Sequence, residues 1–315
     1  MRRSFYCLSF LALVCSAAVH AADGTAQQTQ FGTGNDSSLT LSGSGSATTF
    51  QDGTLNSVVV VQQDEGFGHV AQVEQRGEGN DLQLTQVLGN GSEARVYQNG
   101  VGNQFVVNQE YYANTLDATA TGNDNRLTVY QGSFGEATTV QTGDRNDITV
   151  SQFTAGYGGG TALTQTGNDN VMALTQTSGQ QFSGMVLFDQ VGNFNQAVIN
   201  QGAEQGNLQF TQQGDGNVAT IDQYGRAPTI RGRSVGNGNE VTLRQSFDDP
   251  VIDLVQEGNG NLANVDQSAL YVTASVTQLG DANQASVQQL GGFAGGDSAV
   301  ILQQGTANVA TVLQQ

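Results

Sequence analysis

The stretch "QRGEGNDLQLTQ", residues 75–86, contains the pattern that decides the fold of this 315-residue chain. It places Gln75, Gly77, Asn80 and Gln86 at offsets 0, 2, 5 and 11. The frame QxGxxN returns with Gln at 30, 51, 75, 98, 141, 165, 190, 212, 256, 278 and 303, and two further copies begin with Ala120 and Ser234. The starts are 21 to 25 residues apart, so the chain is predicted to be an array of about 13 repeats of roughly 22 residues.

Apolar and polar residues alternate on both sides of this frame. The residue four positions after the asparagine is aliphatic in every repeat, as Leu84 is here, and the residue two positions after it is mostly apolar, with Ser37 the exception. Apolar and polar residues also alternate in the stretch before the glutamine that opens each repeat, as with Ala94 and Val96 before Gln98. A period of two indicates a strand with one buried face, and the glycine permits a tight turn. Each repeat is therefore predicted to fold as strand, turn, strand.

The asparagine and both glutamines of each repeat stand an even number of residues from the apolar positions of the same strand, so their side chains are predicted to point inward with the apolar ones. If the repeats stack as rungs of a solenoid, identical amides meet in columns and can pass hydrogen bonds from rung to rung. Twelve of the thirteen repeats close with glutamine, and only Leu41 departs. The fold class is predicted to be all-β, a β-solenoid with amyloid-like cross-β stacking.

The predicted structural amide ladder comprises Gln51, Asn56, Gln62, Gln75, Asn80, Gln86, Gln98, Asn103, Gln109, Asn125, Gln131, Gln141, Asn146, Gln152, Gln165, Asn170, Gln176, Gln190, Asn195, Gln201, Gln212, Asn217, Gln223, Asn239, Gln245, Gln256, Asn261, Gln267, Gln278, Asn283, Gln289, Gln303, Asn308 and Gln314. The predicted turn glycines are Gly32, Gly53, Gly77, Gly100, Gly122, Gly143, Gly167, Gly192, Gly214, Gly236, Gly258, Gly280 and Gly305.

The first residues, "MRRSFYCLSFLALVCSAAVHA", have the features of a secretion signal. Arg2 and Arg3 precede an apolar run, and Val19 and Ala21 fit a small-residue cleavage site. The predicted division of the chain is a signal peptide at 1–21, a short leader at 22–29 and the repeat region at 30–315. The apolar run is too short to span a bilayer as a helix, and no membrane insertion is predicted.

Composition narrows the function further. Both cysteines, Cys7 and Cys15, lie in the signal, and His69 is the one histidine beyond it, so thiolate sites and histidine-rich metal centres are excluded. All ten basic residues are arginines; without Arg2 and Arg3, eight remain against 28 acidic residues, a formal charge of −20. Such a chain is a poor partner for nucleic acid or anionic lipid. No cofactor, metal or catalytic residue is predicted.

The repeat resembles that of curlins, Ser-x5-Gln-x-Gly-x-x-Asn-x-Ala-x3-Gln. The segment "SEARVYQNGVGNQFVVNQ", Ser92 to Gln109, is similar to it throughout, with Phe105 in the alanine place, and Ala285 and Ala310 supply that alanine in later repeats. This resemblance implies a subunit of curli, the functional amyloid fibre on the surface of Gram-negative bacteria that serves adhesion and the biofilm matrix. Implied partners are further copies of the chain, a related curlin subunit or nucleator, and an outer-membrane secretion channel. The array is longer than is usual in that family, and the segment before the repeats lacks the family's Gly- and Asn-rich leader.

Three other interpretations compete with a structural fibre. Carboxylate pairs could cleave glycosides, but the acids recur in turns without one distinctive cluster, so no enzyme is predicted. Turns such as "TGNDN" and "GDGN" suggest calcium sites, but the period is near 22 and the inward position holds asparagine, which favours solvated turns. The alternative function is a monomeric extracellular β-solenoid adhesin or surface protein, capped against growth. The sequence stops at Gln315, one residue after the last closing glutamine, which favours the fibre.

Overall fold

The computed structural model of the chain describes residues 6–8, 16–21, 24–64, 66–89, 91–154, 160–178, 184–291 and 296–315. All the regular secondary structure in these residues is β-strand. They contain no helix long and apolar enough to cross a membrane. The chain divides into two compact units, Met1–Gln152 and Phe153–Gln315.

The strands of the first unit are short and regularly spaced. They are β1 Tyr6–Leu8, β2 Ser16–Ala21, β3 Thr25–Thr33, β4 Asp36–Ser42, β5 Ser46–Thr54, β6 Ser57–Gln63, β7 Val70–Glu78, β8 Asp81–Val87, β9 Glu93–Val101, β10 Gln104–Glu110, β11 Thr115–Thr121, β12 Arg126–Gln131, β13 Glu136–Thr142 and β14 Asp147–Thr154, which runs two residues past the unit boundary.

The second unit repeats this arrangement. Its strands are β15 Gly160–Thr166, β16 Val171–Ser178, β17 Met185–Val191, β18 Gln196–Glu204, β19 Asn207–Gln213, β20 Val218–Arg226, β21 Thr229–Val235, β22 Glu240–Gln245, β23 Val251–Glu257, β24 Leu262–Ser268, β25 Thr273–Leu279, β26 Gln284–Leu290, β27 Ser298–Gln304 and β28 Val309–Gln314.

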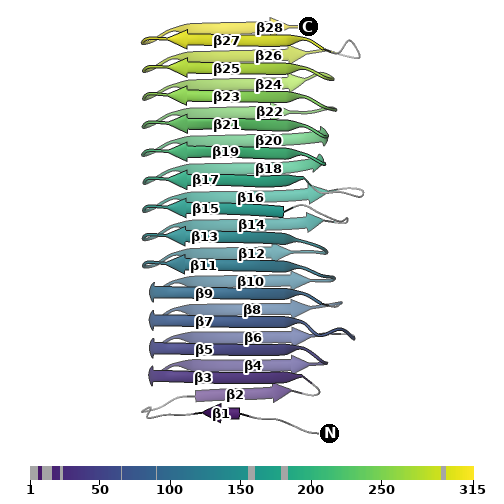
Figure 1. Cartoon of the computed structure of the whole chain (residues 1–315), viewed down its shortest axis with the longest axis vertical. Coiled ribbons are helices and arrows are strands. Elements are labelled where there is room, and N and C mark those ends of the chain that lie inside the picture. The colour runs from purple at the N-terminus through teal and green to yellow at the C-terminus, as the bar shows by residue number, and fades with distance from the viewer. Residues whose placement is uncertain are drawn as a thin grey trace. The chain divides into compact units, whose positions relative to one another are not determined.

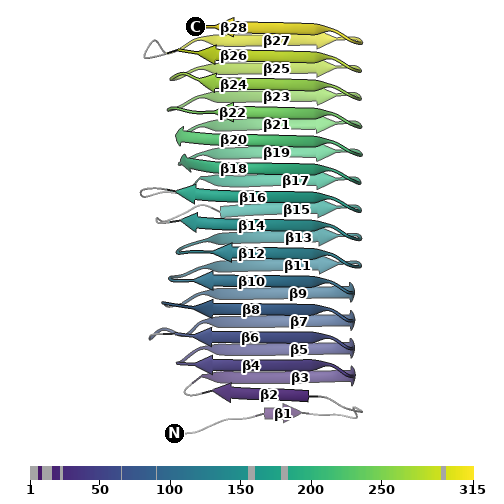
Figure 2. The ribbon, with the colours of Figure 1, turned by 180° about the vertical axis from the view of Figure 1, so that it is seen from behind.

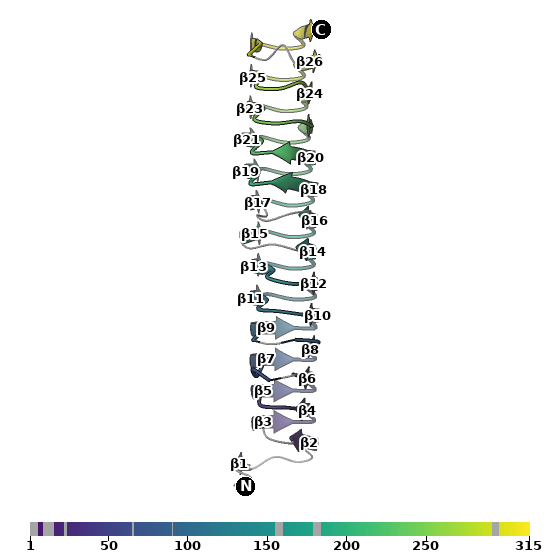
Figure 3. The same ribbon diagram turned by 90° about the vertical axis from the view of Figure 1, so that its right-hand side faces the viewer.

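Within each unit the strands form two parallel sheets. Odd-numbered strands pair in sequence order in one sheet, seen in front in Figure 1, and even-numbered strands pair in the other, seen in front in Figure 2. Figure 3 shows the two sheets of each unit as separate layers joined by the turns. Each of the thirteen repeats supplies one odd and one even strand, from β3 and β4 to β27 and β28. The predicted all-β solenoid is confirmed.

The register aligns equivalent positions of successive repeats. Gln51 is paired with Gln75, and Gln75 with Gln98, in the odd-numbered sheet of the first unit. In the even-numbered sheet of the second unit, Gln223 is paired with Gln245. A shift by one residue would turn every apolar side chain outward, so burial of one face holds this register.

The inward side chains fill the space between the two sheets. Phe188 and Phe210, from neighbouring strands, are buried and stack with their ring centroids 5.5 Å apart. The next position of that column is Gly232, where an added Cβ would lie 2.4 Å from the ring of Phe210. The small residue therefore makes room for the large one, which is how a densely packed core accommodates volume from rung to rung.

The turn after each odd-numbered strand depends on glycine. Gly53 has a φ of +135°, and an added Cβ would lie only 1.9 Å from the carbonyl oxygen of Gly77 in the next rung. All thirteen predicted turn glycines have a φ between +101° and +135°. The glycine is thus required for its backbone conformation and for the close approach of the rung above it.

The amino-terminal residues also contain strands. β2 lies within residues 1–21 and pairs in parallel with β4. β3 begins at Thr25, inside the segment 22–29 predicted as a leader, and its residues pair with β5 from Thr25 onward. The first strand of the first repeat therefore includes part of that segment. Residues 22 and 23 lie outside the described residues, and the signal-peptide interpretation stays a prediction about the precursor.

Candidate functional site

The glutamine that opens each repeat lies on an odd-numbered strand and uses both of its amide N–H groups. Gln51 Nε2 donates to Gln75 Oε1 at 2.8 Å and to the carbonyl oxygen of Asp36 at 2.9 Å. Gln75 Nε2 likewise donates to Gln98 Oε1 at 2.7 Å and to the carbonyl of Ser57 at 2.9 Å. One bond joins successive rungs, and the other joins the two sheets. In the second unit the bonds between opening residues run from 165 to 190, 190 to 212, 256 to 278 and 278 to 303, each 2.9 Å long.

The glutamine that closes each repeat forms an equivalent column on the even-numbered strands. In the first unit Gln62, Gln86, Gln109, Gln131 and Gln152 are joined in that order by bonds of 2.7 to 2.9 Å. In the second unit the column runs from Gln176 through Gln201, Gln223, Gln245, Gln267 and Gln289 to Gln314, with bonds of 2.7 to 3.2 Å. In both glutamine columns the donor always lies in the earlier repeat.

The asparagine column has the opposite polarity. Asn80 Nδ2 donates back to Asn56 Oδ1 at 2.9 Å, and the backbone N–H of Asn80 donates to the same oxygen at 3.1 Å. Asn80 Nδ2 also donates to the carbonyl of Gly100 in the next rung at 3.0 Å. Each asparagine therefore connects three rungs at the turn. Because identical amides satisfy one another, these buried groups avoid the desolvation cost of unpaired amides.

The predicted ladder residues are buried, with the exception of Asn308, which is exposed, and Gln314, which is half-buried; both lie in the last repeat. Two opening positions depart from glutamine. Ala120 has no amide and interrupts the column in the first unit, whereas Ser234 Oγ donates to Gln256 Oε1 at 3.1 Å and maintains it in the second.

Leu41 stands where the other repeats have a closing glutamine, and it leaves a buried hydrogen-bond acceptor unpaired in the next rung. Leu41 is paired with Gln62 in the register, and it has no amide with which to donate to the next rung. Gln62 Oε1 is buried and has no hydrogen-bond partner. A buried acceptor without a donor costs about 1–3 kcal/mol, a penalty that the rungs with a complete glutamine pair avoid.

A further column passes through His69, which stands six residues before the opening glutamine, at the place of the serine in the repeat motif. The buried His69 Nδ1 accepts the backbone N–H of Ser92 at 3.2 Å, and its Nε2 lies 3.2 Å from the carbonyl oxygen of Gln63. Ser92 Oγ accepts the N–H of Asn114, and Asn114 Oδ1 accepts the N–H of Gly135. These partners assign the neutral tautomer with its proton on Nε2. Burial lowers the pKa of His69, against smaller opposing effects of the bond to Gln63 and the charge of Asp64.

The stability of the rungs around His69 is expected to fall on acidification. Because the pKa of His69 is lower in the folded state than its ordinary value of 6.5, the unfolded chain binds the proton first. The stabilisation by neutral His69 is therefore complete above about pH 6.5 and is lost as the pH falls through the lower folded pKa. Exchange of the Ser92 amide, corrected for its intrinsic pH dependence, should be faster near pH 5.5 than near pH 7.5. His69→Gln keeps an acceptor that does not titrate and should abolish the difference; its persistence would assign the effect to another group.

The exposed side of the turn carries a second set of side-chain bonds, called here the turn column and formed by Asn193, Asp215, Asn237, Asn259 and Asp281. The backbone N–H of each donates to the Oδ1 of the next at 2.7 to 2.9 Å. The sequence signal was the recurrent Asn or Asp three residues after the opening glutamine. Two asparagines separate Asp215 from Asp281, so carboxylates of adjacent rungs do not stack here. Among the described residues no group of three or more His, Asp, Glu or Cys side chains could hold a metal ion.

The fold and these columns define a β-solenoid repeat protein whose rungs are joined by buried amide ladders, an architecture consistent with a surface or adhesin-like protein. No family model matches the chain, and no curated protein is significantly similar to it.

Proposed function

We propose that this chain is a secreted structural subunit that assembles end to end into curli-type amyloid fibres, for adhesion and the biofilm matrix on the surface of a Gram-negative bacterium. The observation that carries the proposal is the equivalence of the rungs. Apart from positions 41, 120 and 234, the rungs offer glutamine donors on one side and glutamine acceptors on the other, in the same register, so a rung of one copy can fit a rung of another as it fits its own neighbour.

The last repeat supports this mode of growth. Gln303 Nε2 and Gln314 Nε2 donate to the carbonyls of Gln284 and Ser298, which are the sheet-bridging bonds also seen in earlier rungs, such as those of Gln278 and Gln289. Each amide has a second N–H, and in earlier rungs that group donates to the next glutamine. At the other end, once residues 1–21 with β1 and β2 are removed, Gln30 Oε1 matches the donor of Gln303, since Gln30 Nε2 is the group that bonds to Gln51. The closing position of that first repeat is Leu41, which offers no amide to Gln314.

The exposed apolar side chains of the last repeat also support end-to-end growth. The side chains of Val309 and Leu313 are 72% and 55% exposed, and Ala310 and Val312, which continue the buried columns of β26, are only half-buried. A further rung on β27 and β28 would bury Ala310 and Val312 and pair the strand edges, whereas Val309 and Leu313 lie on the outward face. An exposed strand edge of this kind is a template for another chain.

We expect no catalytic role. His69, the one histidine beyond residues 1–21, is buried, and both of its ring nitrogens are engaged by backbone groups. The proposal therefore places the function in the assembled surface. Its partners are further copies of the chain, with a related subunit or nucleator and an outer-membrane secretion channel as the expected route and initiator of growth.

The chain from residue 22 onward is expected to form fibres in buffer without seeds. Fibre diffraction should give reflections near 4.7–4.8 Å and about 10 Å, because these are the spacings between paired strands and between packed sheets. Electron microscopy and thioflavin binding provide independent measurements. If the protein stays a monodisperse monomer and binds no dye after prolonged incubation at a concentration of tens of micromolar, the proposal is wrong and a monomeric β-solenoid adhesin is favoured.

A further inference from the structure

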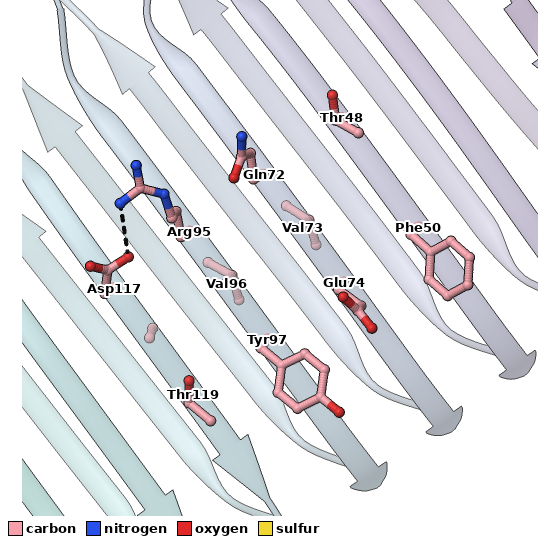
Figure 4. Close-up of a pocket in the computed structure, with 11 residues that line it drawn as sticks. Thr48, Phe50, Gln72, Val73, Glu74, Arg95, Val96, Tyr97, Asp117 and Thr119 are labelled. Atoms are coloured by element: carbon pink, nitrogen blue, oxygen red, sulfur yellow. Dashed lines mark hydrogen bonds and ion pairs between the residues drawn. The ribbon is translucent and has the colours of Figure 1, made fainter.

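The outward face of the odd-numbered sheet in the first unit contains a groove, called here groove 1. Two rows of side chains border it: Thr48, Gln72, Arg95 and Asp117 on one side, and Phe50, Glu74, Tyr97 and Thr119 on the other (Figure 4). The backbone at Val73, Val96 and Ala118 forms the floor between the rows. The hollow has a volume of about 380 Å³. It crosses strands β5, β7, β9 and β11, a span of roughly 14 Å at the spacing of paired strands.

The second unit has a groove at the equivalent positions, called here groove 2. It has a volume of about 270 Å³ and lies between the row Gln209, Arg231 and Asp253 and the row Thr211, Arg233 and Val255. One side of groove 2 repeats, rung by rung, the order glutamine, arginine, aspartate found in Gln72, Arg95 and Asp117. The same three functional groups therefore border a hollow at the same place on the repeat in both units.

Every charged side chain that lines the two grooves is already in an ion pair, including Glu74 with Arg76. Arg95 forms ion pairs with Glu93 and with Asp117, the latter at 3.5 Å, and Arg231 lies 4.0 Å from Asp253. Arg233 pairs with Glu257. These side chains are about half exposed, so their remaining N–H groups and carboxylate oxygens can still bond to a ligand. A neutral polyhydroxylated ligand suits such paired charges better than an anion does, since an anion would have to compete with the carboxylates.

The shape of the grooves selects an extended ligand that lies across the strands. In groove 1, Phe50 and Tyr97 stand in the same row two rungs apart, with Glu74 between them (Figure 4). The ring of Phe50 already contacts Phe31, with centroids 5.8 Å apart, and the guanidinium of Arg76, 5.4 Å from its centroid. The apolar face offered to a ligand is therefore that of Tyr97, and the opposite row presents an amide, a guanidinium and a carboxylate. The rings of an extended, equatorially linked glycan each advance by nearly the spacing of one rung, so successive sugars can meet successive rungs.

We propose that grooves 1 and 2 are two separate binding sites for a neutral, linear polysaccharide chain lying across the strands. Gln72 and Gln209 bond to sugar hydroxyls as amide donors and acceptors, and each arginine–aspartate pair offers donors and acceptors side by side. Tyr97 packs against the apolar face of a sugar ring in groove 1. The proposal concerns the outward face and is independent of assembly, because both grooves lie within single units.

The test is depletion of cellohexaose from solution by the purified chain, assembled or not. Saturable binding to two sites per chain is expected. Gln72→Ala with Tyr97→Ala should weaken groove 1 by about tenfold or more and leave about one site, and Gln209→Ala with Thr211→Ala should do the same for groove 2. All four side chains point outward, so circular dichroism should be unchanged.

The matched control places the same substitutions on the other sheet. Gln83→Ala with Tyr130→Ala removes an outward glutamine and an outward tyrosine from the even-numbered strands β8 and β12 and should leave two sites. The proposal is overturned if cellohexaose does not bind saturably, if the groove variants keep two sites, or if the control loses as much as they do. Tighter binding of an oligogalacturonate or of an extended peptide than of cellohexaose would also overturn it.

Discussion

Gly258→Ala is expected to lower the free energy of unfolding of the second unit by about 4 kcal/mol, and Gly260→Ala, two residues later in the same turn, by only about 1 kcal/mol. Gly258 has a φ of +124°, and an added Cβ would lie 2.1 Å from the carbonyl oxygen of Gly280. Gly260 has a φ of +62°, and an added Cβ would meet nothing within 4 Å. The first substitution combines backbone strain with a clash against the next rung, whereas the second adds backbone strain alone.

In other turns of the chain, the position equivalent to Gly260 holds a residue with a side chain, which supports the small expected loss of stability. Leu55 and Ala282 occupy the equivalent place of other turns with φ values of +57° and +54°. Denaturant unfolding of the two variants, measured before assembly, compares them directly. Equal losses of stability, or a loss below about 1 kcal/mol for Gly258→Ala, would mean that the rungs separate easily at the turn and that the close backbone contact contributes little.

Much of the fold was predictable because one frame recurs at every rung. Alternation around Gln75 and Asn80 identified the strands, their buried face and the inward amides, since a repeat that cannot bury its apolar face alone must stack on its neighbours. The turn glycines followed from the same frame. The cross-rung approach of Gly53 to Gly77 did not, because it depends on the spacing of two backbones that only the stacked structure brings together.

The columns that varied between repeats were not predictable in the same way. His69, Ser92 and Asn114 occupy one column and use three different acceptor atoms. The serine of the repeat motif marks the position, but the hydrogen bonds from rung to rung appear only in the stacked structure. The grooves depend on outward residues, whose identity changes from rung to rung while the inward positions repeat. Gln72 and Gln209 become equivalent only once the register is known.

Gly305→Ala is expected to slow the elongation of fibres by about tenfold or more and to leave the fold of the chain intact. Gly305 is the turn glycine of the last repeat, and an added Cβ would meet only Asn308 Nδ2, at 3.5 Å. At eleven equivalent positions of earlier repeats the Cβ would lie within 1.9 to 2.1 Å of the next glycine carbonyl. If a second copy stacks in register on β27 and β28, its Gly32 carbonyl takes that place, and the methyl group of the variant blocks it.

Gly296→Ala is the matched control, because it separates the blocked contact from backbone strain. Gly296 lies in the connection before β27, has a φ of +103° against +112° for Gly305, and would bring its Cβ within 4 Å of nothing. Both variants carry the strain of a side chain at positive φ, but only Gly305→Ala places a methyl group where an incoming rung must lie. Both should therefore keep β-structure by circular dichroism and unfold at similar denaturant concentrations. Seeds of the unmodified chain should be extended by Gly296→Ala at nearly the normal rate, whereas Gly305→Ala subunits, once added, should present a blocked end. Fibres that grow equally fast from both variants would show that copies do not stack in register at β27 and β28, and the end-to-end mechanism would then be wrong even if fibres form.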